Sequence, residues 1–388
     1  IYNSILTMSE NNVVSIFKHD KQANIVKVAD SFEFKRGGKL PNITMAYETW
    51  GKLNSAKSNV VVVLTGLSAS SHIASSSSDK SAGWWESMVG KNKPINTEEF
   101  HVICINTLGS CFGSTSPVSI NEKTKKPYRL TFPELSVEDM ARGSYLLLKK
   151  LGIDRVKYLI GPSLGGMQAL ALSSLYNNIV ENIILISTAT QAHPYAIAIR
   201  SLQREVIRKD PLWNNGFYDY DKPPLNGVRI ARKIGMTSYR SPREWIQRFG
   251  RKRTSEEKLN QNTFGVDNTN FEYEIESYLE HHAIKFQKLF DANCYLYLSR
   301  AMDWFDLADH GNSTQEVFSR FKIENALVIS AKSDTLFPPQ QQKEIAEGLS
   351  QSGTKVEYKE LQSIQGHDSF LVDIDTFGKE IRKFMKLS

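Results

Sequence analysis

The apolar residues of this chain follow two different periods. Short, nearly continuous apolar runs are typical of strands buried on both faces of a parallel sheet, and they occur at residues 59–64, 101–106, 156–160, 183–187 and 326–330. Alternation within residues 32–47 predicts antiparallel strands ahead of them. Helical spacing at residues 137–151, 167–175 and 376–385 predicts helices between and after the strands. Strands alternating with helices indicate an α/β fold with a mostly parallel sheet.

This alternation stops in the second half of the chain. Residues 188–322 contain no buried strand run, but helical patterns occur at 197–207 and 271–290. We therefore expect a core made of residues 1–187 and 323–388. Residues 188–322 are expected to form a helical lid placed on top of it.

Composition narrows the class of protein. Of 388 residues, 40% are hydrophobic and 23% are charged, which is ordinary globular usage and argues against a disordered or collagen-like chain. The net charge of +6 is scattered. The densest basic cluster, residues 248–253, is typical of a solvated face, so we expect no nucleic-acid partner. The longest apolar run has strand length, so no membrane span is expected either.

Cysteine usage and the first residue bear on the compartment. Cys104, Cys111 and Cys294 have no metal-like spacing, so we expect no metal site and a reducing compartment. The chain opens at Ile1, with Met8 inside, which suggests a processing boundary. We expect a cytoplasmic protein, or one of the mitochondrial matrix if a transit peptide has been removed.

Ser163 is the candidate nucleophile. It lies in the sequence GPSLGG, which contains the pattern G-x-S-x-G, between the strand at 156–160 and the helix at 167–175. This is the setting of a nucleophile elbow, in which glycines permit a turn too tight for side chains. The competing interpretation is a glycine-rich turn with a capping serine.

A serine nucleophile needs a base and an orienting carboxylate, which in this fold follow it in the order Ser, acid, His. Asp334 comes just after the strand at 326–330, and His367 lies in the loop before the last helix. Taken singly, Asp334 would be a turn former and His367 a surface histidine. All three in the required order predict a catalytic triad.

Attack by such a serine on a carbonyl group also needs donors for the oxyanion that forms. The backbone N–H of Leu164, directly after the nucleophile, is one; the other is expected from the loop after the strand at 59–64, where Thr65, Gly66 and Leu67 lie. The serine-rich stretch 68–78 follows, and its position leaves two interpretations open: a flexible loop or a loop that faces a ligand.

Strings spread over nearly the whole chain resemble the homoserine O-acyltransferases of the α/β-hydrolase fold. They are FKRGGKL, MAYETWGKLN, TGLSASSH, GWWESMVG, INTLGSCFGSTSP, GPSLGGMQAL, YLYLSRAMDWFDL and QGHDSF. Within that family, GWWESMVG, IAIRSLQREVIRKDP and NCYLYLSRAMDWFDLAD are most similar to the branch that acylates L-serine with succinyl-CoA. The resemblance implies an eight-stranded, mostly parallel α/β-hydrolase sheet, with no cofactor beyond acyl-CoA as co-substrate.

The resemblance also implies residue roles. Ser163, Asp334 and His367 would form the triad, and Leu67 would lie at the oxyanion hole. Arg232 and Asp368 would bind the amino acid, because its carboxylate needs a cation and its ammonium an anion. A succinyl group carries a second carboxylate, for which Arg200 and Arg204 are our candidates.

The expected activity is a ping-pong transfer of succinyl or acetyl from acyl-CoA to L-serine, in cysteine biosynthesis. The nearest alternative is acetylation or succinylation of L-homoserine in methionine biosynthesis. A carboxylesterase and a non-catalytic binding module are less favoured. Helices of an insertion this size often pair, so we expect a homodimer.

Overall fold

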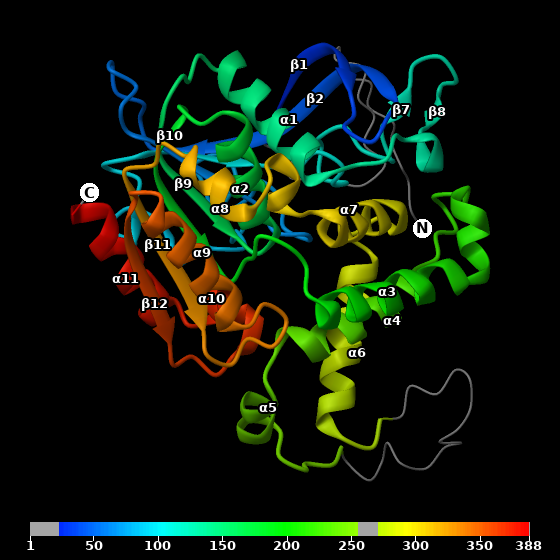
Figure 1. Ribbon diagram of the computed structural model, residues 1–388. Coiled ribbons are helices and arrows are strands. Elements are labelled where there is room, and N and C mark those ends of the chain that lie inside the picture. The colour runs from blue at the N-terminus through cyan, green and yellow to red at the C-terminus, as the bar shows by residue number, and fades with distance from the viewer. Residues whose placement is uncertain (1–22, 255–270, 388) are drawn as a thin grey trace.

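The main sheet has eight strands in the order β1-β2-β6-β3-β9-β10-β11-β12 (Figure 1). The computed structural model describes residues 23–254 and 271–387. Ile1, Met8 and residues 255–270 of the expected lid lie outside this part.

In the main sheet, β2 is antiparallel to both of its neighbours, and the other neighbouring pairs are parallel. The predicted fold class is therefore confirmed. The strands are Asn24–Glu33 (β1), Lys39–Trp50 (β2), Val60–Leu64 (β3), His101–Ile105 (β6), Val156–Pro162 (β9), Val180–Ile186 (β10), Asn325–Ala331 (β11) and Lys355–Leu361 (β12).

Both faces of this sheet are covered. In β3, Val60, Val62 and Leu64 belong to one hydrophobic core, and Val61 and Val63 belong to another. Successive strand side chains point to opposite faces, so a continuous apolar run requires cover on both sides. The first core includes residues of α1 (Val137–Lys150), α2 (Leu164–Leu175) and α9 (Pro339–Gln351); the second includes residues of α11 (Ile374–Leu387).

Local signals account for most of these elements. The Ser136 side chain accepts a hydrogen bond from the backbone of Asp139, whose side chain bonds back, so α1 begins with a capping box. The five predicted buried strands match β3, β6, β9, β10 and β11 within a few residues. β12 carried only a weak signal, because it is an edge strand whose residues are all at least partly exposed.

The described residues between β10 and β11 form helices and short 3₁₀ turns, and no strand of a sheet. We call the described residues of the range 188–322 the helical segment. α3 packs on α4 and α7, and α4 packs on α6. Figure 1 shows α3, α4 and α6 grouped to one side of the sheet. The helices are Pro194–Lys209 (α3), Leu225–Tyr239 (α4), Pro242–Arg248 (α5), Glu274–Gln287 (α6), Ala292–Trp304 (α7) and Thr314–Ser319 (α8).

The remaining elements are small. Two short ribbons pair Val89–Gly90 (β4) with Ile95–Asn96 (β5) and Ile120–Asn121 (β7) with Lys126–Pro127 (β8). A helix of one turn, Ser369–Val372 (α10), precedes α11. Within the described ranges, no helix is both long enough and apolar enough to cross a membrane.

Candidate active site

Ser163 lies in a sharp turn between β9 and α2, with φ 53° and ψ −124°. A positive φ is strained for a non-glycine residue, and the packing around the turn enforces it. A Cβ atom at Gly161 would lie 2.4 Å from the backbone oxygen of Gly165. One at Gly165 would lie 2.2 Å from the backbone oxygen of Leu64. Neither position has room for a side chain, so the turn has the strand–turn–helix geometry of a nucleophile elbow.

Three residues that are distant in the sequence meet at this turn. His367 Nε2 lies 2.9 Å from Ser163 Oγ, and His367 Nδ1 lies 2.8 Å from Asp334 Oδ2. The other oxygen of Asp334 accepts hydrogen bonds of 2.9 Å from the backbone N–H groups of Leu336 and Phe337. The three side chains are buried. A hydroxyl bonded to an imidazole that is oriented by a fixed carboxylate is a complete nucleophilic triad.

Neighbouring groups change the pKa of His367 and limit its contact with water. Burial lowers the pKa of His367, but the charge and hydrogen bond of Asp334, together with the charge of Asp368, raise it, so that its pKa lies above the ordinary value of 6.5. The Phe337 ring stacks on the imidazole with centroids 5.0 Å apart, and Phe370 meets it edge-on at 5.9 Å. These rings keep bulk water from the base on those sides.

The loop after β3 brings Leu67 to the site. Leu67 and Ser68 line the cavity at Ser163. Leu164 is the first residue of α2, where backbone N–H groups have no partner within the helix. The backbone N–H groups of Leu67 and Leu164 are therefore the candidates to stabilise an oxyanion at Ser163.

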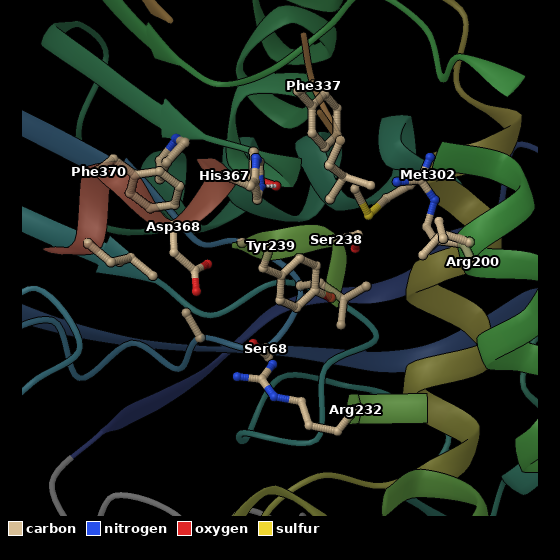
Figure 2. Close-up of a pocket in the computed structure, with 18 of the residues that line it drawn as sticks. Ser68, Arg200, Arg232, Ser238, Tyr239, Met302, Phe337, His367, Asp368 and Phe370 are labelled. Atoms are coloured by element: carbon tan, nitrogen blue, oxygen red, sulfur yellow. Dashed lines mark hydrogen bonds between the residues drawn. The ribbon is translucent and has the colours of Figure 1, made fainter. Parts of the chain in front are cut away.

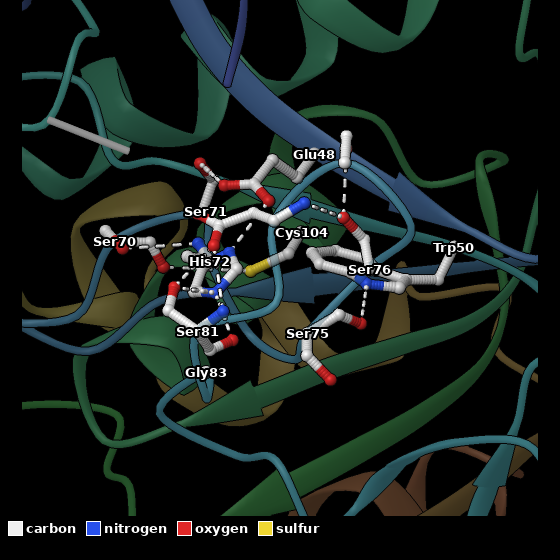
Figure 3. Close-up of polar contacts among 12 residues, drawn as sticks. Glu48, Trp50, Ser70, Ser71, His72, Ser75, Ser76, Ser81, Gly83 and Cys104 are labelled. Atoms are coloured by element: carbon white, nitrogen blue, oxygen red, sulfur yellow. Dashed lines mark hydrogen bonds and ion pairs between the residues drawn. The ribbon is translucent and has the colours of Figure 1, made fainter. Parts of the chain in front are cut away.

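A buried cluster of polar side chains holds the residues that follow Ser68 in this loop (Figure 3). His72 Nδ1 lies 3.0 Å from Glu48 Oε2 on β2, and His72 Nε2 lies 3.0 Å from the carbonyl oxygen of Ser81. The Ser71 hydroxyl donates to the other oxygen of Glu48, at 3.2 Å. The Ser81 hydroxyl also lies 3.2 Å from His72 Nε2. The sequence left two interpretations of the serine-rich stretch, a flexible loop or a loop that faces a ligand. Ser68 lines the cavity, whereas Ser71 and His72 are held by the contacts to Glu48.

Three charged side chains line the cavity besides the triad (Figure 2). They are Arg200 from α3, Arg232 from α4, and Asp368, which follows the catalytic histidine. Figure 2 shows Arg232 and Asp368 pointing into the same central space, with Arg200 beside Met302. Arg232 Nε is buried without a hydrogen-bond partner among the described residues. A small zwitterion with one more anionic group would match this set of charges.

Arg200 and Arg204 occupy different places, although they are one helical turn apart. Both pair with Asp303, Arg200 Nε at 2.5 Å from Oδ1 and Arg204 Nη2 at 2.7 Å from Oδ2. Arg200 is 4% exposed, lines the cavity, and keeps Nη2 buried without a hydrogen-bond partner in the part of the chain that is described. Arg204 lies outside this cavity and lines another, together with Arg208 and Trp304.

Sequence reasoning missed several lining residues. Trp84, Gln203, Ser238, Tyr239 and Met302 also line the cavity. Four of them come from the helical segment, where no motif marks them. The one available signal was the position of Ser238 and Tyr239, about two turns after Arg232 on the predicted helix.

Comparison with known proteins agrees with this geometry. Residues 59–373 match the family model of the α/β-hydrolase fold. The chain is 49% identical over 355 residues to a serine O-succinyltransferase of Stenotrophomonas maltophilia (strain K279a), covering 91% of this chain and 95% of that protein. It is 48% identical over 369 residues to an L-serine/homoserine O-acetyltransferase of Streptomyces lavendulae, covering 94% and 97%. The chain belongs to the serine and homoserine O-acyltransferase family of the α/β-hydrolase fold. It is an acyltransferase.

Solved structures include both acyltransferases and esterases. The family member homoserine O-acetyltransferase from Bacillus anthracis superposes with a TM-score of 0.84 at 28% identity, covering 94% of this chain and 97% of that one. Esterase E22 superposes with a TM-score of 0.82 at 29% identity, covering 94% and 99%. The fold therefore supports transfer of an acyl group to different acceptors.

The first prediction concerns the acid limb of the pH profile. A protonated His367 cannot accept the Ser163 proton, so kcat/KM for a p-nitrophenyl ester should fall as the pH decreases through a pKa above 6.5. Asp334→Asn removes the charge that raises this pKa. It should move the limb to lower pH and reduce kcat about 10⁴-fold. Asp375→Asn on the exposed side of α11 is the control, and an unmoved limb in Asp334→Asn would contradict the assignment.

The second prediction concerns the loop anchor. His72→Phe removes a hydrogen-bond partner of the buried Glu48 side chain, which should lower the free energy of unfolding by about 1–3 kcal/mol. It should also lower kcat for ester cleavage by up to about 100-fold, because the Leu67 N–H is displaced. Urea unfolding and steady-state kinetics measure the two effects. His101→Phe, which loses a bond to a backbone carbonyl, is the control; an unchanged kcat in a destabilised His72→Phe enzyme would separate the cluster from catalysis.

Proposed function

We propose that the protein transfers a succinyl group from succinyl-CoA to the hydroxyl of L-serine by a ping-pong mechanism. The observation that carries the proposal is the triad opening onto a cavity that presents Arg200, Arg232 and Asp368. The similarity to serine O-succinyltransferases supports the choice of acyl group and acceptor.

In the first half-reaction, Ser163 Oγ attacks the thioester carbonyl carbon while His367 Nε2 takes the hydroxyl proton. The N–H groups of Leu67 and Leu164 bond the oxyanion of the tetrahedral intermediate. The C–S bond then breaks, and the CoA sulfur leaves with the proton from His367. The product is a succinyl ester of Ser163.

In the second half-reaction, L-serine occupies the space left by CoA. Arg232 binds its carboxylate and Asp368 its ammonium, which aims its hydroxyl at His367. His367 takes that hydroxyl's proton as the oxygen attacks the acyl-enzyme. The bond to Ser163 Oγ breaks, Oγ regains the proton, and O-succinyl-L-serine is released.

Transfer competes with hydrolysis, because water could attack the same acyl-enzyme. The helical segment contributes α3, α4 and α7 to the cavity wall, and we propose that it acts as a lid that limits the access of water. A second candidate function is ester hydrolysis, favoured by the likeness to esterase E22.

The third prediction tests the reaction and its rival together. Serine and homoserine are each combined with succinyl-CoA and acetyl-CoA, and release of free thiol is followed. Serine with succinyl-CoA should be fastest, and Ser163→Ala should lose at least about 10⁴-fold in kcat. Thiol release that is equally fast without any amino acid would identify a hydrolase. Release that persists in Ser163→Ala would reject the covalent mechanism.

The fourth prediction concerns the choice of acyl group. The free Nη2 of Arg200 is expected to bond the distal carboxylate of succinyl, a charge-assisted contact worth about 1.5–3 kcal/mol. Arg200→Leu should therefore lower the ratio of kcat/KM for succinyl-CoA over acetyl-CoA by about 10-fold to 100-fold. Arg204→Leu is the matched control, since it shares Asp303 but lies outside the cavity. If both variants change the ratio equally, Arg200 has no direct part in donor choice.

A further inference from the structure

Arg240 follows the last residue of α4 and reaches toward the catalytic turn. Its Nε lies 3.2 Å from Asp368 Oδ2, and its Nη1 donates a hydrogen bond of 2.9 Å to Glu244 Oε1. The side chains of Arg240, Glu244 and Asp368 are 14%, 11% and 24% exposed. A guanidinium thus links a carboxylate of α5 to the carboxylate beside the catalytic base.

The backbone holds this guanidinium in a fixed place. The Ser241 hydroxyl donates to the carbonyl oxygen of Ile364, which joins the end of α4 to the catalytic turn. Gly366 has a φ of 66°, and a Cβ there would lie 2.7 Å from the backbone oxygen of Tyr239. The chain at 239–241 therefore packs directly on residues 364–368. The backbone of Arg240 is therefore held beside Asp368.

Asp368 is the carboxylate of this group that a ligand in the cavity can reach. Two carboxylates and one guanidinium carry a net charge of −1, and only Asp368 of the three lines the cavity. Burial raises the pKa of Asp368 above its ordinary value of 3.8, while Arg240 is the largest opposing influence. The other charged groups that act on Asp368 are His367 and Arg232, which lower its pKa, and Asp334, which raises it.

We propose that Arg240 is a positioning residue for the acceptor. By forming an ion pair with Oδ2, it keeps Asp368 ionised and oriented, so that Oδ1 can receive the ammonium group of an amino acid. Glu244 holds the guanidinium from the other side, which prevents Arg240 from entering the cavity and taking the ammonium's place. The inference rests on the proposed function, because it assigns Arg240 to the second half-reaction.

The fifth prediction separates the two half-reactions. Arg240→Gln should raise KM for L-serine about 10-fold to 100-fold, because Asp368 loses the contact that fixes its charge. The rate at which succinyl-CoA acylates Ser163, measured as a burst of free thiol, should stay within about twofold. Arg240→Lys restores the charge and should recover part of the loss. Arg243→Gln, three residues away and exposed, is the matched control.

Two further measurements distinguish a positioning role of Arg240 from a purely structural role. Removing Arg240 takes away an influence that lowers the pKa of Asp368, so KM for L-serine should begin to rise at a higher pH on acidification than in the parent enzyme. In addition, the parent enzyme should prefer L-serine over 3-hydroxypropanoate, which lacks the ammonium, and Arg240→Gln should lose most of this preference.

The outcomes are distinguishable. An unchanged KM for L-serine in Arg240→Gln, or a burst that slows as much as the transfer step, would overturn the role of Arg240 while leaving the transferase intact. If L-serine does not accelerate turnover of the acylated parent enzyme, the proposed function fails and this inference fails with it.

Discussion

Ser163 occupies a left-handed backbone conformation between β9 and α2, and the site depends on the packing that holds it there. The elbow touches β3 through Gly165 and bonds β10 through the N–H of Ser163, at 2.9 Å from the oxygen of Ile186. Strain of this kind persists only where the surroundings determine it fully. The parallel sheet provides those surroundings, since β3, β9 and β10 lie side by side. The nucleophile is thus fixed by the same strands that form the core.

The residues of the candidate site lie together because the parallel strands of the sheet have their carboxyl ends on the same side. The loop that contains Leu67 follows β3, Ser163 follows β9, Asp334 follows β11 and His367 follows β12. Each functional residue is then in a loop, while its position is set by a buried strand. The helical segment adds Arg200 and Arg232 to the cavity wall, and Asp368 comes from the turn that holds His367. The cavity is therefore lined by both parts of the chain.

The sequence allowed much of this to be predicted, and the part it missed has a physical reason. Continuous apolar runs marked the central strands, and the ordered Ser, Asp and His marked the triad, because these signals are local. Arg200 and Arg204 could not be separated, since residues one turn apart share a helix face. Only the packing of α3 on α7 decides which of them reaches the cavity. Arg240 was missed for a similar reason: its partner Asp368 is far away in the sequence.

The contact between the end of α4 and the catalytic turn restricts how ligands can exchange. Swinging this part of the helical segment outward would break the Ser241 bond to Ile364 and the Arg240 pair with Asp368 together. Wide hinged opening at this point would therefore cost both contacts in every turnover. Exchange of ligands that leaves the end of α4 seated on the catalytic turn keeps both of them.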